Sequence, residues 1–248
     1  MKLAGIQLRP LHRAEALARF SEILKNGHGE MVVTMNPEMI VHATRDQLFK
    51  TIIHSAEMHL IDGFGIQLVA RLKRWPRVER LTGVDAIDHL CEMAAEQGSR
   101  VFFLGTRNQT TLMRAAHELK RRYPKFNIVG THVGSEIFET HEGVRVADPR
   151  AHEEAIDRIN VTQPDMLFVA FGHSKQEKWI WHHKKQLPSV KLFMGVGGAF
   201  EMIAGDIRRA PRFMRRIGLE WAWRLAKEPW RGRRVWNATA VFLWKALR

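Results

Sequence analysis

The sequence predicts an α/β fold, with a mostly parallel β-sheet, helices on both faces and a helical, basic C-terminal appendage. Short apolar runs alternate with segments of helical spacing between residues 30 and 200, and the loops are mostly short. Two of these runs, Met166–Phe171 and Val190–Val196, each meet glycine at the C-terminal end and are followed by helical sequence. After Gly205 the alternation stops. This pattern is typical of a Rossmann-like sheet, in which helical crossovers join parallel strands.

The N-terminal elements follow from local periodicity and from the turn residues that end each run. Asn26-Gly27 closes the first helix, Met35-Asn36-Pro37 stops a β-branched strand, and Asp62-Gly63-Phe64-Gly65 ends the next strand. The predicted elements are a strand at Leu3–Leu8, a helix at Ala14–Leu24, a strand at Met31–Thr34, a helix at Gln47–Ser55, a strand at His59–Ile61 and a helix at Ile66–Leu72.

The middle of the chain continues the alternation. A helix follows Gly83, because Val84, Ile87, Leu90 and Met93 share one helical face. The next predicted elements are a strand at Val101–Leu104, a helix at Leu112–Arg122, a strand at Asn127–Gly130, a loop at 131–149 and a helix at Ala151–Ile159. We therefore expect an α/β domain over residues 1–204 and a separate appendage over residues 205–248.

The appendage carries most of the net charge of +13. Residues 207–248 hold twelve Lys or Arg against two Glu, so a phosphate-bearing partner is expected: nucleic acid, anionic lipid or a nucleotide. Two helices are predicted here, Arg212–Lys227 and Trp230–Leu247, with Pro229 between them. Apolar residues recur every four positions in the first helix: Phe213, Ile217, Trp221 and Leu225. Such a stripe suits either packing on the domain or an interfacial membrane helix with a basic face.

Targeting and redox signals are few. Cys91 is the single cysteine, which excludes an intramolecular disulfide and fits a reducing compartment. The N-terminus lacks the apolar core of a signal peptide. The longest late uncharged run, Val235–Trp244, is about half the ~20 residues that span a bilayer. A protein that lies on a membrane without crossing it is expected.

Ligands of parallel sheets bind at the carboxyl ends of the strands. The polar and glycine residues predicted there are Thr34, Asn36, Asp62, Gly63, Gly105, Thr106, Gly172 to Gln176, and Gly195 to Gly198. No G-x-G-x-x-G follows the first strand and no P-loop motif is found, which disfavours a nucleotide-dependent oxidoreductase. A tight turn is the simpler explanation for each glycine, yet the Gly195, Gly197 and Gly198 run would let a pyrophosphate approach the backbone.

Three polar residues leave alternatives open. Asp62 is either a turn residue that caps the next helix or a general base that takes a proton from an attacking hydroxyl. The amide of Gln176 can donate to and accept from a sugar or a base, whereas Glu177 suits the first turn of a helix. The thirteen histidines show no metal-ligand spacing, so neither a metal nor a cofactor is predicted.

Between about residues 31 and 226 the chain contains, in this order, the segments VVTMNPEM, LIDGFGI, ERLTGVD, VFFLGT, PDMLFVAFGHSKQEKWI, MGVGGAFE and GDIRRAP…GLEWAWRL. These segments resemble the motifs of the WecG/TagA/CpsF family of bacterial glycosyltransferases and occur in the family's order. The resemblance implies an inverting, metal-independent transfer of a sugar, N-acetylmannosamine or glucose-type, from its UDP form to an undecaprenyl-diphosphate-linked saccharide. This transfer would serve cell-surface polysaccharide synthesis.

The same resemblance implies roles for individual residues. Asp62 matches the proposed general base, Thr34 and Asn36 match polar residues beside it, and Arg80 matches a cleft arginine. Gln176 matches the glutamine of the P-K-Q-E motif, while Arg209 and Arg216 belong to an appendage that would complete the site near the donor diphosphate. The sequence departs from the family at His173-Ser174, in place of a variable residue and proline, and lacks the aromatic G-Y-F of the 131–149 loop.

A peripheral location at the cytoplasmic face of the plasma membrane would follow, with an anionic lipid surface as a partner. The residues expected to meet it are Arg212, Arg215, Trp221, Arg224, Trp230, Arg233 and Arg234. A homo-oligomer stays open, because exposed tryptophan and arginine could equally form a subunit contact. The alternatives to a glycosyltransferase are a basic nucleic-acid-binding protein and the disfavoured oxidoreductase, and aromatics clustered with aliphatics favour lipid over nucleic acid.

Overall fold

A computed structural model describes residues 1–75, 78–106, 108–216 and 218–247. Its centre is a six-stranded sheet in which every strand pairing is parallel, in the order β4-β3-β10-β9-β5-β6. The strands are β3 (Glu30–Met35), β4 (Met58–Ile61), β5 (Arg100–Gly105), β6 (Asn127–His132), β9 (Met166–Ala170) and β10 (Leu192–Gly195). The predicted parallel α/β fold is confirmed, and each end of the six strands was predicted to within two residues.

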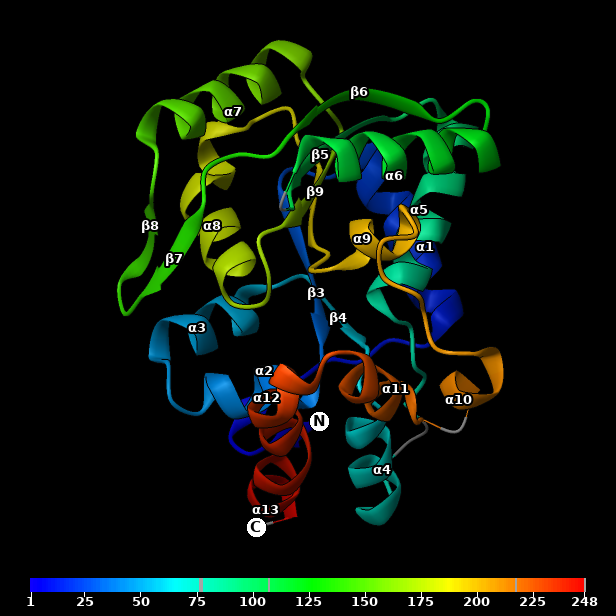
Figure 1. Ribbon diagram of the computed structural model, residues 1–248, viewed down its shortest axis with the longest axis vertical. Coiled ribbons are helices and arrows are strands. Elements are labelled where there is room, and N and C mark those ends of the chain that lie inside the picture. The colour runs from blue at the N-terminus through cyan, green and yellow to red at the C-terminus, as the bar shows by residue number, and fades with distance from the viewer. Residues whose placement is uncertain (76–77, 107, 217, 248) are drawn as a thin grey trace.

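Helices cover both faces of this sheet (Figure 1). They are α1 (Arg13–Asn26), α2 (Pro37–Ala43), α3 (Gln47–Ser55), α5 (Gly83–Gln97), α6 (Gln109–Arg122), α7 (Pro149–Thr162), α8 (Lys175–His183) and α9 (Ala199–Ile203). Helix α4 (Phe64–Leu72) lies at the lower end of the molecule in Figure 1 and contacts α13. Alternate strand residues face opposite helix layers, as the two-residue period of a strand requires. Leu167 and Val169 of β9 belong to one buried cluster, whereas Met166 and Phe168 belong to the other.

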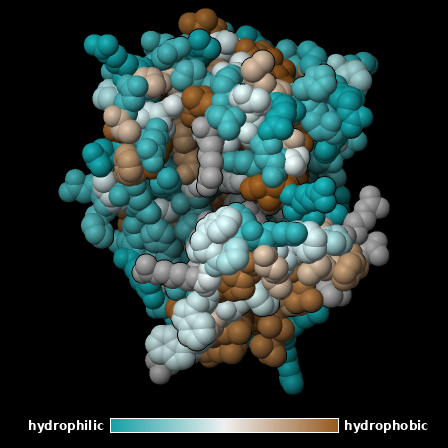
Figure 2. Space-filling view, viewed as in Figure 1, coloured by the Kyte–Doolittle hydropathy of each residue, from teal (hydrophilic) through white to brown (hydrophobic). Residues whose placement is uncertain are grey.

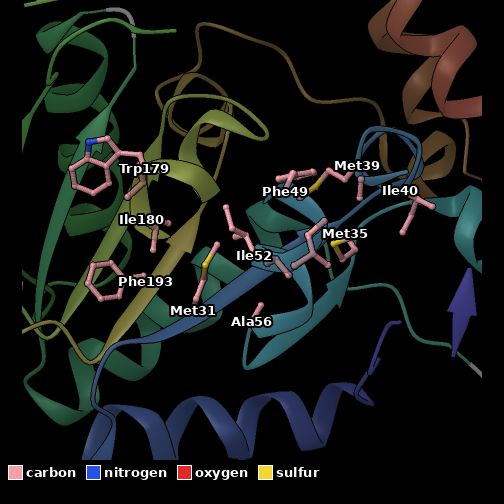
Figure 3. Close-up of a cluster of buried hydrophobic side chains, with 14 of the residues drawn as sticks. Met31, Met35, Met39, Ile40, Phe49, Ile52, Ala56, Trp179, Ile180 and Phe193 are labelled. Atoms are coloured by element: carbon pink, nitrogen blue, oxygen red, sulfur yellow. The ribbon is translucent and has the colours of Figure 1, made fainter. Parts of the chain in front are cut away.

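The first cluster lies between the sheet and helices α2, α3, α7 and α8. Figure 3 shows part of it, with Met31 and Phe193 from the sheet near Ile52 of α3 and Ile180 of α8. The second cluster joins the opposite face to α1, α5, α6 and α9, and the rings of Phe103 and Phe200 lie 4.7 Å apart there. Strands buried on both faces need apolar residues at nearly every position, which is why they appear in the sequence as continuous apolar runs.

The strand order places the functional loops together. From β3 the chain moves outward to β4, whereas β5 and β6 lie on the far side and β9 and β10 fill the middle. Because the strands are parallel, their carboxyl ends share one edge of the sheet. A crevice outside this edge is the expected ligand site of such a sheet.

Some local predictions are wrong. The opening strand is a small hairpin of β1 (Lys2–Leu3) and β2 (Ile6–Gln7), because Ala4 and Gly5 adopt φ of 47° and 79° and reverse the chain. The 131–149 loop contains a second antiparallel hairpin, β7 (Ile137–Thr140) and β8 (Gly143–Val146). Helix α2 was not predicted, although Pro37 is its first residue and the Asn36 side chain caps it by accepting from Met39 N at 3.0 Å.

The appendage is more broken than the two predicted helices. It comprises α10 (Arg212–Arg216), α11 (Glu220–Lys227), a 3₁₀ turn (Pro229–Arg231), α12 (Gly232–Trp236), a π-helical turn (Asn237–Val241) and α13 (Phe242–Leu247). Gly218, at φ 80°, lies between α10 and α11, and Ile217 of the predicted stripe lies outside the described residues.

The end of the appendage docks on the α/β part through buried side chains. Phe242 and Ala246 of α13 are buried in the same cluster as α2 and α4 residues, and Figure 1 shows α13 beside these helices. A Cβ at Gly65 would lie 3.4 Å from the Phe242 ring, so glycine allows this close approach. Within the described ranges, no helix combines the length and the apolar character that crossing a bilayer needs.

Candidate active site

A cleft of about 920 Å³ opens at the carboxyl edge of the sheet. The α/β part contributes the ends of β3, β4, β9 and β10, and the appendage contributes the opposite wall with Arg208, Lys227 and Trp230. Of the site residues predicted from the sequence, the cleft lining includes Thr34, Asn36, Asp62, Gln176, Gly197, Gly198 and Trp230. It also includes residues that sequence reasoning missed: Glu38, Asn108, Thr111, Glu201, Asp206, Arg208 and Lys227. Glu38, Glu201, Asp206 and Arg208 lie within the matched segments VVTMNPEM, MGVGGAFE and GDIRRAP, but no site role was assigned to them from the sequence.

Asp62 stands at the end of β4, fixed by its backbone N–H, which donates to Met35 O at 2.9 Å. Its side chain lines the cleft and keeps 32% of its surface exposed. Burial raises the pKa of this carboxyl to about 6, and the negative charge of Glu220 adds to the rise, while Arg80 opposes it. A carboxyl with such a pKa is ionised at neutral pH and is a stronger base than an ordinary aspartate.

Two N–H groups face this carboxyl at long range. Gly83 N, at the start of α5, lies 3.5 Å from Oδ2, and Arg80 Nη2 lies 3.9 Å from Oδ1. Neither contact is a short charge-assisted hydrogen bond. Among the residues that the structure describes, none makes a short bond to this carboxylate, so it keeps lone pairs for a ligand.

Thr34 and Asn36 flank Asp62 from the neighbouring strand end. Thr34 is 9% exposed on β3, which pairs in parallel with β4. The side-chain oxygen Oδ1 of Asn36 caps α2, and this bond fixes the side chain in the cleft wall. Both residues are thus held by backbone structure rather than by mobile loops.

Gln176 is 3% exposed and is engaged with protein groups on both sides of its amide. Its Oε1 accepts from Gly197 N at 2.9 Å, and its Nε2 donates to Glu177 Oε1 at 2.7 Å. A Cβ at Gly195 would lie 2.4 Å from that Nε2, so packing alone accounts for the glycine there. Gln176 thus holds the turn after β10 in shape at the cleft.

Glu177 is fully buried beside it, accepting from Ser174 N at 2.6 Å as well as from Gln176. Burial raises the pKa of Glu177 to about 7, an effect that these two hydrogen bonds oppose. The first-turn position predicted from the sequence is observed, and the complete burial was not predicted.

Arg80 and Arg209 do not belong to the cleft lining. Arg80 Nε donates to Asp62 O at 3.2 Å and its Nη2 to Glu220 Oε2 at 2.7 Å. Arg209 donates to Asp85 Oδ1 at 2.9 Å and to Thr82 Oγ1 at 3.0 Å. Both arginines thereby join the appendage to the segment around the start of α5.

Gly105 is also outside the lining. It has φ of 100°, and a Cβ there would lie 2.9 Å from the carbonyl carbon of Ala170 on the neighbouring strand. Close packing against the neighbouring strand is therefore enough to explain why this position needs glycine.

Several appendage residues were predicted to meet a membrane. Trp221 and Trp230 are 44% and 76% exposed, and Arg215 is half-buried, with its carbonyl oxygen accepting from Arg80. The side chains of Arg212, Arg216, Arg224, Arg233 and Arg234 lie outside what the structure describes. Figure 2 shows hydrophobic residues gathered at the lower end of the molecule, where α4 and α13 lie in Figure 1.

A charge cluster around the buried Lys178 was not predicted. Lys178 of α8 contacts Asp46 and Glu139, which with His42 form a group whose ligand atoms lie within 4.8 Å of one another. Three such side chains could bind a cation, but the lysine ammonium already lies 2.6 Å from Asp46 and 2.8 Å from Glu139. The Lys178 ammonium therefore neutralises these carboxylates in place of a metal ion.

Comparison with known proteins identifies relatives. The model of the glycosyl transferase WecG/TagA/CpsF family matches residues 1–248. A Bacillus spizizenii protein is 32% identical over 212 residues, covering 86% of this chain and 77% of its own length. A Staphylococcus aureus protein is 32% identical over 215 residues, covering 86% of this chain and 78% of its own. Both are named N-acetylglucosaminyldiphosphoundecaprenol N-acetyl-β-D-mannosaminyltransferase.

Proposed function

Because the chain belongs to the WecG/TagA/CpsF family of glycosyltransferases, we propose that it moves a sugar from a UDP-sugar to a polyprenyl-diphosphate-linked saccharide. The names of the two relatives support N-acetylmannosamine as the sugar and N-acetylglucosaminyl-diphosphoundecaprenol as the acceptor. A glucose-type donor is the second candidate. The family match favours this function over that of a nucleic-acid-binding protein or an oxidoreductase.

The observation that carries the proposal is the Asp62 carboxyl, placed in the cleft wall with a pKa raised to about 6 by burial. In an inverting transfer, an acceptor hydroxyl oxygen attacks the anomeric carbon of the donor and the bond from this carbon to the UDP oxygen breaks. The UDP leaves with that electron pair, and the hydroxyl proton passes to Asp62. Ground-state binding of this hydroxyl to Asp62 would also orient it for attack.

The leaving diphosphate develops negative charge, which cationic side chains stabilise. Arg208 and Lys227 line the cleft from the appendage, opposite the strand ends. We assign these two residues, rather than Arg80 and Arg209, to the diphosphate, since the latter are engaged with Glu220 and Asp85. The 1–204 part would then hold the base, and the 205–248 part would complete the donor site.

An acceptor with a long polyprenyl chain stays in the bilayer, so the enzyme must work at a membrane surface. The exposed tryptophans of the appendage and its basic composition support peripheral binding to anionic lipid at the cytoplasmic face. The cleft opens beside this same appendage. Membrane binding and access to the lipid-linked acceptor would therefore depend on one surface.

The test is an Asp62→Asn variant assayed with UDP-N-acetylmannosamine and a lipid-linked N-acetylglucosaminyl diphosphate. Transfer should fall by at least about a hundredfold, the low end of general-base contributions, while donor affinity by calorimetry is kept. Asp88→Asn, an exposed carboxylate of α5 outside the cleft lining, is the matched control and should keep full activity. Unchanged turnover in Asp62→Asn would exclude Asp62 as the base.

A further inference from the structure

Two carboxylates compete for one arginine at the edge of the cleft. The Nη2 of Arg80 lies 2.7 Å from Glu220 Oε2 and 3.9 Å from Asp62 Oδ1. Glu220 belongs to α11 of the appendage, 158 residues beyond Asp62 in the chain. The short charge-assisted bond thus goes to the appendage, and Asp62 has only the long contact.

The rest of the guanidinium is anchored as well. Arg80 Nε donates to the main-chain oxygen of Asp62 at 3.2 Å, and Nη1 donates to the main-chain oxygen of Arg215 at 3.1 Å. With three bonds in different directions, the planar fork has a defined orientation. Without the Glu220 carboxylate, the guanidinium could turn toward Asp62, which is the other carboxylate within 4 Å of it among the described residues.

We propose that Glu220 is a positioning residue, which holds the Arg80 guanidinium away from the Asp62 carboxylate so that this carboxylate stays available to the acceptor hydroxyl. The inference rests on the proposed role of Asp62 as the base. An arginine in direct contact with a base stabilises its ionised form and so weakens it. Glu220 prevents this loss without touching the substrate.

The charges around Asp62 agree with this arrangement. Arg80, from the segment before α5, favours its ionised form, whereas Glu220 from α11 and Asp85 from α5 disfavour it. Arg209, from the segment after α9, pairs with Asp85 at 2.9 Å and has its Nε 3.7 Å from Glu220 Oε1. Of the two acidic neighbours, Asp85 has its own arginine at short range, so Glu220 is the one that controls Arg80.

The test is the pH dependence of kcat/KM in Glu220→Gln, with the same donor and lipid-linked acceptor. In the wild type, kcat/KM should fall on the acid side of the pH profile as Asp62 becomes protonated. Neutralising Glu220 should move the midpoint of this acid limb down by about 0.5–1 pH unit, because Asp62 loses a negative neighbour and gains a closer arginine. The plateau rate should fall about threefold to tenfold, since a weaker base accepts the proton less readily. Glu220→Asp, which keeps the charge, should leave the acid limb near its wild-type position.

Trp223→Phe is the control for appendage docking, because Trp223 Nε1 donates to Arg208 O at 3.2 Å and carries no charge. It should leave the midpoint of the acid limb unchanged, whatever it does to KM. An unshifted or upward-shifted limb in Glu220→Gln, with the melting temperature retained, would overturn the inference. If Glu220→Gln does not fold, an acid limb in Glu220→Asp displaced as far as one pH unit would overturn it instead.

The two variants separate this inference from the proposed function. Full activity in Asp62→Asn would show that Asp62 is not the general base, and the role proposed for Glu220 would then have no basis. An inactive Asp62→Asn together with an unshifted Glu220→Gln profile would leave the base in place and reject only the role of Glu220.

Discussion

The ammonium of Lys178 lies 2.6 Å from Oδ2 of Asp46, and no part of the lysine side chain reaches solvent. The same nitrogen donates to Thr140 O at 2.8 Å and lies 2.8 Å from Glu139. These contacts join α8, the start of α3 and the β7–β8 hairpin. A buried charge thus fixes three segments that are distant in sequence.

Replacement of Lys178 by methionine should destabilise the protein by about 3–5 kcal/mol, because two partly buried carboxylates lose their cation. Chemical denaturation measures the free energy of unfolding. Lys185→Met, at an exposed position of the segment after α8, should change it by less than about 0.5 kcal/mol. If Lys178→Met lowers the free energy of unfolding no more than Lys185→Met does, the contacts of Lys178 with Asp46 and Glu139 contribute little to stability.

Glu177 should make stability depend on pH. Its carboxyl has the ordinary glutamate pKa of 4.5 in the unfolded chain, whereas burial raises this pKa to about 7 in the folded protein. Between these values the folded state keeps a proton that the unfolded state has lost. The stabilising contribution of Glu177 is therefore complete below pH 4.5 and is lost as pH rises to 7.

The comparison with Glu177→Gln isolates this effect from histidines such as His59 and His183, whose lowered pKa values act in the opposite direction. From pH 5 to pH 8, the wild type should lose roughly 2–3 kcal/mol of unfolding free energy relative to the variant. Denaturant titrations at the two pH values provide the measurement, with Glu96→Gln as an exposed control. Parallel pH curves for wild type and Glu177→Gln would contradict the prediction.

Gly105 was expected to contact substrate, and its surroundings offer a packing reason instead. Gly105→Ala should cost more than about 2 kcal/mol, because a positive φ and a Cβ 2.9 Å from Ala170 backbone both oppose it. Gly98→Ala, at φ 71° with open space around the Cβ, should cost only about 1 kcal/mol. A stable Gly105→Ala with a raised donor KM would instead assign this glycine to the ligand.

The wild-type enzyme should lose activity in mild acid. If Asp62 must be ionised, kcat/KM should fall about tenfold per pH unit below about 6, the pKa to which burial raises this carboxyl. Initial rates across pH 4.5–8.5 at low acceptor concentration test this, with circular dichroism to verify folding at each pH. A fall in kcat/KM with its midpoint near pH 4 would contradict the prediction, because the pKa of Asp62 would then be that of an ordinary aspartate.

Trp236 and Trp244 should bind lipid. They are 64% and 55% exposed, at the end of α12 and within α13. Replacing both with alanine should weaken binding to phosphatidylglycerol vesicles about tenfold or more, since each removes a large apolar side chain. Vesicle sedimentation is the assay.

The matched control is Val161→Ala, which changes an apolar residue of α7 that is 81% exposed and far from the appendage in sequence. It should bind vesicles like the wild type. If the tryptophan variant keeps full vesicle binding but loses self-association in ultracentrifugation, the surface is a subunit contact and the membrane role is wrong.

The sequence by itself determined the parallel α/β fold and the positions of the candidate residues along it. Hydrophobic periodicity is local, and strands buried on both faces give apolar runs that any window of the chain reveals. Parallel strands end at one edge, so the residues at the end of each run or just after it, such as Thr34, Asp62 and Gly197, could be placed together from the order of the elements alone. The β7–β8 hairpin escaped prediction because its short strands are stabilised by contacts with α8.

Only the tertiary structure decided what these side chains do in the cleft. The pKa of Asp62 depends on burial and on Arg80 and Glu220, which lie 18 and 158 residues away. Gln176 holds a turn, and Arg80 and Arg209 pair with acids of distant segments. Electrostatic effects act through space and grow with desolvation, so residue identity and spacing cannot give them until the fold has set the distances.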